Sequence, residues 1–291
     1  ISLSDNKLMY QNEDFKLISK SELNELLSMV LDTYKKIQPE NEWVYNNDVK
    51  PHIVLKKEIN ENSKVSFMGD YHSSLHSLLE CLEDLRENND FFKENSWELN
   101  DNRYLVFTGD LVDRGPYGIE CLSLLYLLFI INNQNDYKVI ILNGNHEEKE
   151  IYTIYGFGQE VINQLGEYDY YKDFIYLIDH LPVALFLKFD KPNSKWFQFC
   201  HGAIDLETQL NTDIIRLFLI RDENILILEG TNDNGNGFLW GDLTNNQIQS
   251  DEHGRPQLAK STLVEVLDDL NIEMIISGHQ DLENLGLVLR D

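Results

Sequence analysis

The chain has 291 residues, of which 42% are hydrophobic, enough for a substantial core in one large domain or two small ones. No segment is long and apolar enough to predict a membrane span. The 50 acidic residues outnumber the 24 basic ones and give a formal net charge of −26. Because this charge repels nucleic-acid backbones and anionic lipids, we expect no nucleic-acid partner. This negative charge either keeps the protein soluble or favours binding to a basic protein partner.

The three cysteines, Cys81, Cys121 and Cys200, form no C-x-x-C pair, and their odd number argues against a disulfide framework. We therefore expect reduced thiols in a cytoplasmic setting. The first residues as given show no secretory signal peptide.

An N-terminal helix is the first expected element. Ser19 to Glu22 have the spacing of a capping box, and leucines then recur at helical spacing until the chain reaches Pro39. Residues 40–62 are polar, with Trp43 and Ile53 as hydrophobic anchors. We interpret residues 1–62 as a helical extension that packs on a compact domain formed by residues 63–291.

Strands and helices then alternate, which predicts an α/β domain with helices covering a sheet. Residues 88–102 and 229–237 have the composition of surface loops. Strands are expected at 64–69, 103–108, 138–142, 183–188, 196–201 and 272–277, and helices at 73–87, 117–132, 159–178, around 212–221 and at 260–270.

Three short blocks, each following an apolar run, carry the strongest signal of the sequence. They are Gly69–His72, Gly109–Gly115 and Gly144–Glu147, and His201 and His279 follow two further apolar runs. A single Gly-Asp turn is usually an ordinary turn or helix cap. Five blocks at strand ends favour one shared site, because ligands gather where the loops of an α/β fold diverge.

The candidate ligands in these blocks are two Asp, one Asn and three His. Oxygen and imidazole ligands in this number suit two divalent cations about 3.5–4 Å apart. The pattern therefore predicts a two-metal phosphoesterase. His146-Glu147 does not begin a zinc-protease motif, because Glu150 stands where the second His would be needed.

The blocks resemble those of the phosphoprotein phosphatase (PPP) family of metal-dependent serine/threonine phosphatases, in the calcineurin-like metallophosphoesterase superfamily. That family has the blocks GDxHG, GDxVDRG, GNHE, HGG and a late GH, which correspond here to residues 69–73, 109–115, 144–147, 201–203 and 278–279. Residues 239–242 match a further family block. The resemblance runs from the N-terminal helix to about residue 280. It implies an α/β metallophosphoesterase fold, with a central β-sandwich of mixed sheets flanked by helices.

The resemblance also implies roles for ten residues. His146 would be the general acid, oriented by Asp113, and Arg114 and Arg255 would bind phosphate oxygens. The six implied metal ligands are Asp70 and His72 for one ion, Asp110 as the bridge, and Asn145, His201 and His279 for the other. The implied reaction is direct attack of a metal-bridging hydroxide on phosphoserine or phosphothreonine. We expect manganese to support activity in vitro, with iron or zinc as alternatives in vivo.

Three departures from the family pattern leave the substrate open. Ser73 replaces a Gly, Ala203 replaces the second Gly of HGG, and the sequence ends soon after His279, where the family continues into a loop over the cleft. Phosphotyrosine and diadenosine tetraphosphate are therefore alternative substrates. A scaffold without catalysis is disfavoured, because every expected site residue is present.

The composition, rich in Asn, Ile and Lys, is similar to that of effector phosphatases that intracellular bacterial pathogens inject into host cells. This resemblance implies secretion from a bacterium into the host cytosol. The expected partner is a phosphoprotein, with basic residues flanking the phosphorylated position; the sequence indicates no regulatory partner.

Overall fold

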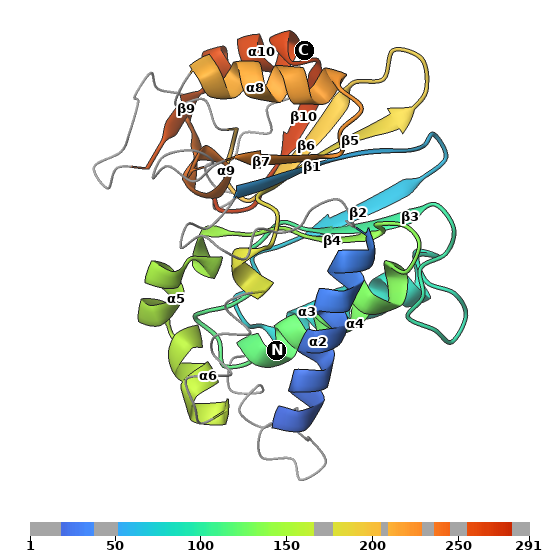
Figure 1. Cartoon of the computed structure of the whole chain (residues 1–291), viewed down its shortest axis with the longest axis vertical. Coiled ribbons are helices and arrows are strands. Elements are labelled where there is room, and N and C mark those ends of the chain that lie inside the picture. The colour runs from blue at the N-terminus through green and yellow to red at the C-terminus, as the bar shows by residue number, and fades with distance from the viewer. Residues whose placement is uncertain are drawn as a thin grey trace.

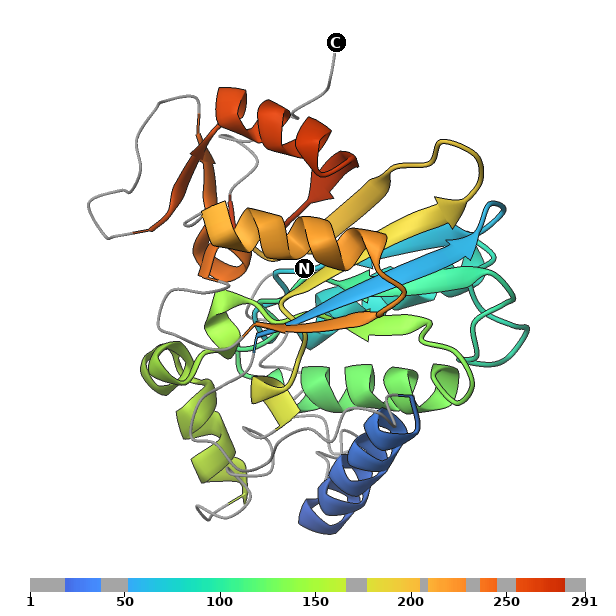
Figure 2. The same ribbon diagram turned by 45° about the horizontal axis from the view of Figure 1, so that its top comes forward.

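The computed structural model describes residues 19–37, 52–165, 177–204, 209–228, 236–244 and 255–280. Within them, two β-sheets pack face to face and helices cover both outer faces, so the fold is a four-layer α/β sandwich (Figure 1). The view in Figure 2 shows helices α8 and α10 on one outer face and α2 and α4 on the other. Within the described residues, no helix is long and apolar enough to cross a membrane.

The larger sheet has five strands in the order β10-β6-β5-β1-β7. It is mixed: β1 runs parallel to β5 and antiparallel to β7, while β6 runs antiparallel to β5 and parallel to β10. Its strands are β1 (His52–Asn60), β5 (Ala184–Asp190), β6 (Trp196–Cys200), β7 (Ile225–Leu228) and β10 (Ile272–Ile276).

The smaller sheet consists of β2 (Lys64–Met68), β3 (Arg103–Phe107) and β4 (Val139–Ile141), all parallel. Parallel strands end at the same edge of a sheet, so the three loops that follow them meet there. A separate parallel pair is formed by β8 (Asp242–Thr244) and β9 (Gln257–Ala259).

Three hydrophobic clusters hold the four layers together. Strand β3 shows how, because its side chains alternate between two of them: Val106 packs between the sheets, while Leu105 and Phe107 face the helices below. A strand buried on both faces is a continuous apolar run, as in Tyr104–Phe107. The third cluster lies between the five-stranded sheet and helices α8 (Gln209–Ile220), α9 (Asn236–Trp240) and α10 (Lys260–Asp269).

The helical layer on the three-stranded sheet includes the expected N-terminal helix, α2 (Lys20–Ile37). Its capping box is formed as the sequence predicts: Ser19 N donates to Glu22 Oε2 at 2.9 Å, and Glu22 N donates to Ser19 Oγ at 3.3 Å. The Tyr34 and Phe129 rings, 4.5 Å apart, pack α2 on α4. The other helices of this side are α3 (Leu75–Glu87), α4 (Gly118–Asn132), α5 (Lys149–Tyr155) and α6 (Phe157–Leu165).

The expected α/β class and the six expected strands are confirmed, with ends that differ by up to two residues. The helix expected at 159–178 is confirmed only as α6, since residues 166–176 lie outside the described residues. In the loop expected at 229–237, α9 begins at Asn236, and 229–235 lie outside the described residues. Residues 88–102 form no helix or named strand, but Phe91, Phe92 and Leu99 are buried.

Strand β1 corrects the expectation that residues 40–62 are only a polar part of a helical extension. Residues 52–60 lie inside the five-stranded sheet, paired on both sides. Lys56, Lys57 and Glu58 interrupt the apolar pattern and hide the strand in the sequence. The Lys56 ammonium is buried and donates to the Phe218 carbonyl oxygen near the end of α8 at 2.9 Å. The division of the chain at residue 62 stays a prediction.

Candidate active site

Eight of the ten predicted site residues line one cavity of about 380 Å³, and Asp113 and His201 do not. It lies beyond the carboxyl ends of the strands, where loops from both sheets meet. His201 lies directly behind its wall and is fully buried. The residues that line the cavity are Asp70, His72, Asp110, Arg114, Asn145, His146, Ile151, Tyr155, Trp240, Arg255 and His279.

Left-handed backbone conformations aim several of these side chains into the cavity. The φ angles are 54° at Asp70, 52° at Asp110 and 70° at His279, at the turns that follow β2, β3 and β10. Asp and His are among the side chains that tolerate this region, and such conformations concentrate at functional sites. Ser73, which stands where the family has Gly, is buried and has φ 61°. The substituted Ser thus keeps a backbone conformation typical of Gly.

Two glycines let the central loops touch. A Cβ on Gly109 would lie 2.5 Å from Gly144 Cα, and Gly109 has φ 93°. A Cβ on Gly144 would lie 2.5 Å from Asp110 Oδ1. Only Gly permits this approach, which brings the loops after β3 and β4 together around Asp110.

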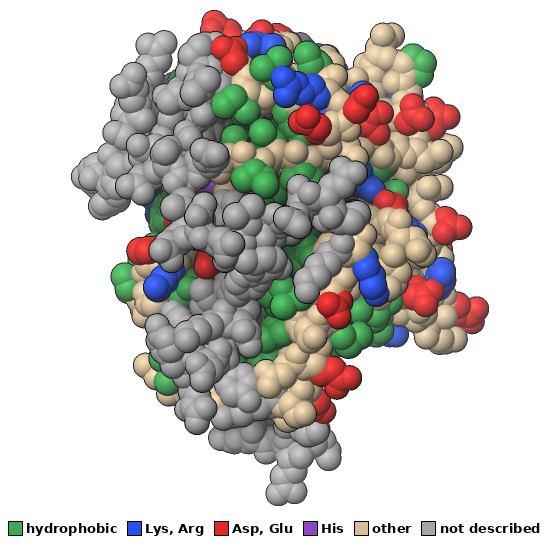
Figure 3. Space-filling view, in the orientation of Figure 1, with side chains coloured by type: hydrophobic (Ala, Val, Ile, Leu, Met, Phe, Trp, Pro, Cys, Tyr) green, Lys and Arg blue, Asp and Glu red, His purple; other side chains and the backbone are tan. Residues whose placement is uncertain are grey.

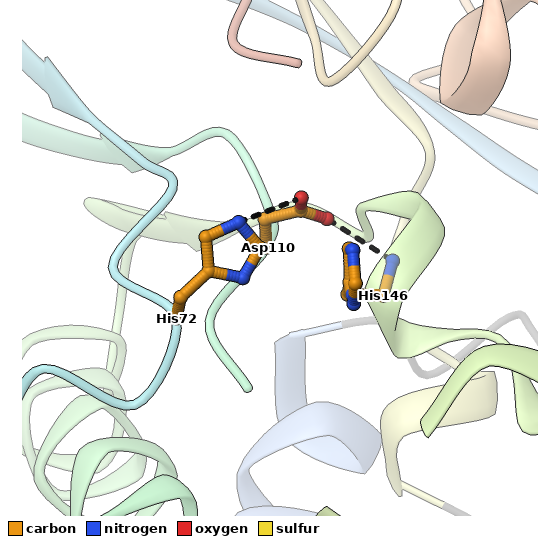
Figure 4. A group of neighbouring side chains, drawn as sticks. All are labelled: His72, Asp110 and His146. Carbon is orange, nitrogen blue, oxygen red and sulfur yellow. Dashed lines mark hydrogen bonds and ion pairs between the residues drawn. The ribbon is translucent and has the colours of Figure 1, made fainter. Parts of the chain in front are cut away.

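Asp110 is shared by the two groups of candidate ligands. His72 Nε2 lies 3.4 Å from Asp110 Oδ2, and Asp110 Oδ1 accepts a hydrogen bond from His146 N at 3.0 Å (Figure 4). His72 Nδ1 donates to the Val112 carbonyl oxygen at 3.2 Å, which leaves Nε2 as the nitrogen that faces Asp110. His72 and Asp110, expected at the first ion, therefore face each other, whereas Asp70 Oδ1 lies 3.8 Å from Nδ1 of His201, a residue expected at the second ion.

The second group converges on His201. Its Nδ1 donates to the Thr108 carbonyl oxygen at 3.1 Å, so Nε2 is the nitrogen available to a ligand. His201 Nε2 lies 2.8 Å from Asn145 Oδ1, 3.2 Å from Asp110 Oδ1 and 3.1 Å from His279 Nδ1. Two acceptor oxygens and two imidazole nitrogens thus face one another.

Such a set of atoms stabilises positive charge at its centre. Burial alone would lower the pKa of His201, but the Asp110, Asp70 and Glu147 carboxylates together outweigh it and the pKa is raised. Burial and the neighbouring His201 lower the pKa of His279 to about 3, and its Nε2 is buried without a hydrogen-bond partner among the described residues. A neutral imidazole is the form that binds metal. The donor set therefore fits a divalent cation.

The carboxylates and histidines can be grouped into two overlapping triads in the described part of the chain. In each, one ligand atom per residue lies within 4.8 Å of the others. The triads are Asp70, Asp110 and His201, and His72, Asp110 and His146. Asp110 is common to both, consistent with a bridging position.

His146 and its neighbours form a second functional unit beside the ligands. Its Nδ1 hydrogen-bonds to Asp113 Oδ2 at 2.8 Å, and its Nε2 lies 3.2 Å from Arg114 Nη2. A guanidinium only donates, so His146 Nε2 accepts here and carries no proton. The Tyr155 ring packs edge-on against His146, with the centroids 5.1 Å apart.

Arg255 also lines the cavity, at the start of the segment that leads into β9. Its guanidinium carbon is 5.5 Å from the centroid of the Trp240 ring. The same indole meets the His279 ring edge-on at 6.0 Å. The two arginines expected to bind phosphate therefore both line the cavity, and one rests on an aromatic face.

The sequence analysis missed the role of Glu147. This fully buried carboxylate accepts backbone N–H groups of Asp110 (2.8 Å), Leu111 (2.8 Å), Val112 (3.2 Å) and Gly144 (2.8 Å). Burial, with the nearby Asp110 charge, raises its pKa to about 7. Its position next to His146 in the third block was the available signal. Glu147 binds the loops after β3 and β4 into one unit.

The model of the calcineurin-like phosphoesterase family matches residues 63–281. The chain therefore belongs to the calcineurin-like phosphoesterase family. The fold and the metal-ligand geometry described above agree with this membership.

Solved structures support the fold. A protein serine/threonine phosphatase from Saccharomyces cerevisiae aligns with a TM-score of 0.64 at 18% identity, over 96% of this chain and 78% of that one. A cold-active protein tyrosine phosphatase aligns with a TM-score of 0.53 at 17% identity, over 81% of this chain and 68% of that one. At these identities the likeness concerns the fold.

Proposed function

We propose that this chain is a metal-dependent protein phosphatase that hydrolyses phosphoserine and phosphothreonine. One observation carries the proposal: a single cavity and the buried side chains next to it bring together two overlapping groups of candidate metal ligands, a His-Asp pair and two arginines. Divalent ions bound there would lower the pKa of a water molecule and neutralise phosphate charge. Manganese is the ion we propose for activity in vitro, with iron or zinc in vivo.

The protein's own groups supply the remaining parts of the reaction. Arg114 and Arg255 both line the cavity and would bind phosphate oxygens through their planar guanidinium groups. When the phosphate binds the Arg114 guanidinium, His146 Nε2 is released and can hold the proton that the leaving alkoxide needs. Asp113, fully buried, stabilises the protonated ring through Nδ1.

The charge of the surface supports a substrate with basic residues around the phosphorylated position. Asp and Glu outnumber Lys and Arg, and Figure 3 shows them spread over the described part of one face. Negative charge of this kind steers a basic segment toward the site.

The decisive experiment loads the purified chain with Mn²⁺ and measures phosphate release from peptides that differ only in phosphoserine, phosphothreonine or phosphotyrosine. Asp110→Asn is the matched control. Release from the first two peptides that is lost in the variant supports the proposal. Preference for the phosphotyrosine peptide would instead make the enzyme a tyrosine phosphatase, and the cold-active protein tyrosine phosphatase described above has a similar fold. Activity only on diadenosine tetraphosphate would replace the protein substrate by a nucleotide.

We also propose a cytosolic site of action, which includes a host cytosol if the chain is a bacterial effector. The free thiols of Cys81, Cys121 and Cys200 support a reducing compartment, although Cys81 is exposed. Translocation of a tagged chain into host cells tests the effector hypothesis, and failure to enter them would contradict it.

A further inference from the structure

A hydrogen bond between Glu148 and Trp240 joins two segments that follow different sheets. Glu148 directly follows the short helical turn η1 (Asn145–Glu147), which comes after β4 of the three-stranded sheet. Trp240 is the last residue of α9, which packs on the five-stranded sheet. The indole Nε1–H donates to Glu148 Oε2 at 2.6 Å. None of the metal-binding or proton-transfer roles proposed above uses this pair.

Both ends of this bond are fixed to loops that carry ligands. Glu148 N donates to the Asn145 carbonyl oxygen at 3.2 Å. On the other side, Gly202 N donates to the Phe238 carbonyl oxygen at 2.7 Å, so α9 is attached to the loop that begins at His201. The Glu148–Trp240 bond therefore couples the loop of Asn145 to the loop of His201.

Trp240 in turn supports Arg255. The Arg255 guanidinium lies over the indole ring at 5.5 Å, within the range of a cation–π contact. The edge-on contact with His279 fixes the same ring from another direction. The indole thus provides one support for the guanidinium of Arg255 at the cavity.

The chemical type of Glu148 points to positioning rather than to substrate contact. A carboxylate beside a phosphate-binding cavity repels the phosphate dianion, so its presence there has an electrostatic cost. The same charge makes it a stronger acceptor for an indole N–H than a neutral group would be. The 2.6 Å bond to Trp240 is the gain that offsets this cost.

We propose that Glu148 is a positioning residue that holds Trp240, and through it the Arg255 guanidinium, in the orientation that binds the substrate phosphate. The inference rests on the proposed function, because it takes phosphate as the ligand of Arg255. It predicts a loss of phosphate affinity, expressed mainly in KM, when the hydrogen bond is removed.

The test is a double-mutant cycle on the full-length, Mn²⁺-loaded chain, with the dissociation constant of inorganic phosphate as the readout. Glu148→Ala weakens phosphate binding roughly tenfold, the size typical of residues that orient a primary ligand. In the Arg255→Ala background the same change no longer weakens phosphate binding, because the two residues act through one contact. Glu148→Gln keeps an acceptor oxygen and binds phosphate about as tightly as the wild type. The control, Glu150→Ala, removes an exposed carboxylate two residues away and leaves affinity unchanged.

Additive losses in the double variant, or unchanged affinity in Glu148→Ala, would overturn the proposal. Indole ¹H–¹⁵N resonances give a readout that does not depend on activity, with the Trp240 signal assigned from Trp240→Phe. It shifts upfield in Glu148→Ala and stays in place in Glu150→Ala; a signal that does not move in Glu148→Ala contradicts the proposal. A wild-type chain that binds no phosphate contradicts the proposed function instead, and the resonance then still decides whether Glu148 holds Trp240.

Discussion

Asp113 accepts a hydrogen bond from His146 Nδ1 at 2.8 Å with one carboxylate oxygen and from Phe157 N at 2.9 Å with the other. The second bond fixes Asp113 to the first residue of α6, and the carboxylate is fully buried. His146 therefore carries its proton on Nδ1, and Nε2 is the nitrogen next to Arg114. The orientation of the proposed general acid depends on a carboxylate that is itself held from two sides.

Replacing this carboxylate by an amide is predicted to affect turnover. Asp113→Asn lowers kcat roughly 10²-fold or more, because an amide no longer stabilises a charged imidazolium ring. KM for the same phosphopeptide changes little, since phosphate is bound by the arginines. Steady-state kinetics measure both constants, and a melting curve verifies the fold. A loss confined to KM would argue against the assigned role.

Two substrates with different leaving groups can distinguish a role in proton transfer from a role in phosphate binding. His146→Asn slows hydrolysis of a phosphoserine peptide by roughly 10²- to 10⁴-fold, because serine alkoxide needs protonation to leave. Hydrolysis of p-nitrophenyl phosphate falls much less, since nitrophenolate leaves without a proton. Comparison of kcat for the two substrates in the same variant checks this. Equal losses would show that His146 is not the general acid.

Removal of metal is predicted to abolish activity reversibly. Chelation with EDTA stops phosphate release, and added Mn²⁺ restores it, because the donor groups around Asp110 fit divalent cations. Titration calorimetry of the apo chain should show about two ions per chain. Asp110→Asn, which alters the residue common to both groups, binds fewer ions and loses nearly all activity. Full activity of the thoroughly chelated chain would contradict the metal site.

Glu160 makes stability depend on pH. Its carboxylate accepts the N–H groups of Gly118 (3.1 Å) and Ile119 (3.0 Å) at the start of α4, and burial raises its pKa from 4.5 to about 7. The folded chain therefore binds this proton more tightly than the unfolded chain. The contribution to the free energy of unfolding is largest below pH 4.5. It declines by up to roughly 3 kcal/mol as the pH rises to about 7.

Glu160→Gln removes this titration while it keeps an acceptor oxygen. Urea unfolding of both proteins across this pH range gives the difference between their free energies of unfolding. We expect the wild type to lose stability relative to the variant as the pH rises. A difference that does not vary with pH would show that Glu160 titrates normally in the folded chain.

The packing of α2 tests whether the N-terminal helix belongs to the core. Leu23 is fully buried in the cluster beneath the three-stranded sheet. Leu23→Ala should reduce the free energy of unfolding by roughly 2–5 kcal/mol through lost burial and a cavity. Glu25→Ala, an exposed change on the same helix, serves as the control. If Leu23→Ala melts at the wild-type temperature, α2 is a dispensable extension.

The candidate metal ligands could be located in the sequence because each directly follows an apolar strand, a local pattern. Asp70, Asp110 and Asn145 each needed only their neighbouring Gly and the preceding run to be found. The structure places all of the predicted site residues in or behind one cavity, although the roles assigned to them stay predictions. Parallel strand ends account for this success, since they bring separate blocks to one edge.

Contacts between residues far apart in the chain could not be predicted from the sequence. Strand β1 was missed because Lys56 interrupts its apolar pattern. Its ammonium group is buried where it donates to the Phe218 carbonyl oxygen near the end of α8, 162 residues away, and no local pattern predicts that contact. Glu147 and Glu148 are adjacent acidic residues in the sequence, yet one accepts four backbone N–H groups and the other an indole 92 residues away. Only the tertiary structure shows that these two adjacent residues have different hydrogen-bond partners.

The contact between Asp70 and His279 has a consequence for biosynthesis. His279 N donates to Asp70 Oδ2 at 3.0 Å, so the earliest and the latest of the candidate ligands in the chain lie side by side. His279 follows β10, which pairs with β6 at the edge of the five-stranded sheet. A nascent chain that lacks β10 therefore has an incomplete metal site. We therefore predict that phosphate-ester cleavage begins only after nearly all of the described residues have left the ribosome.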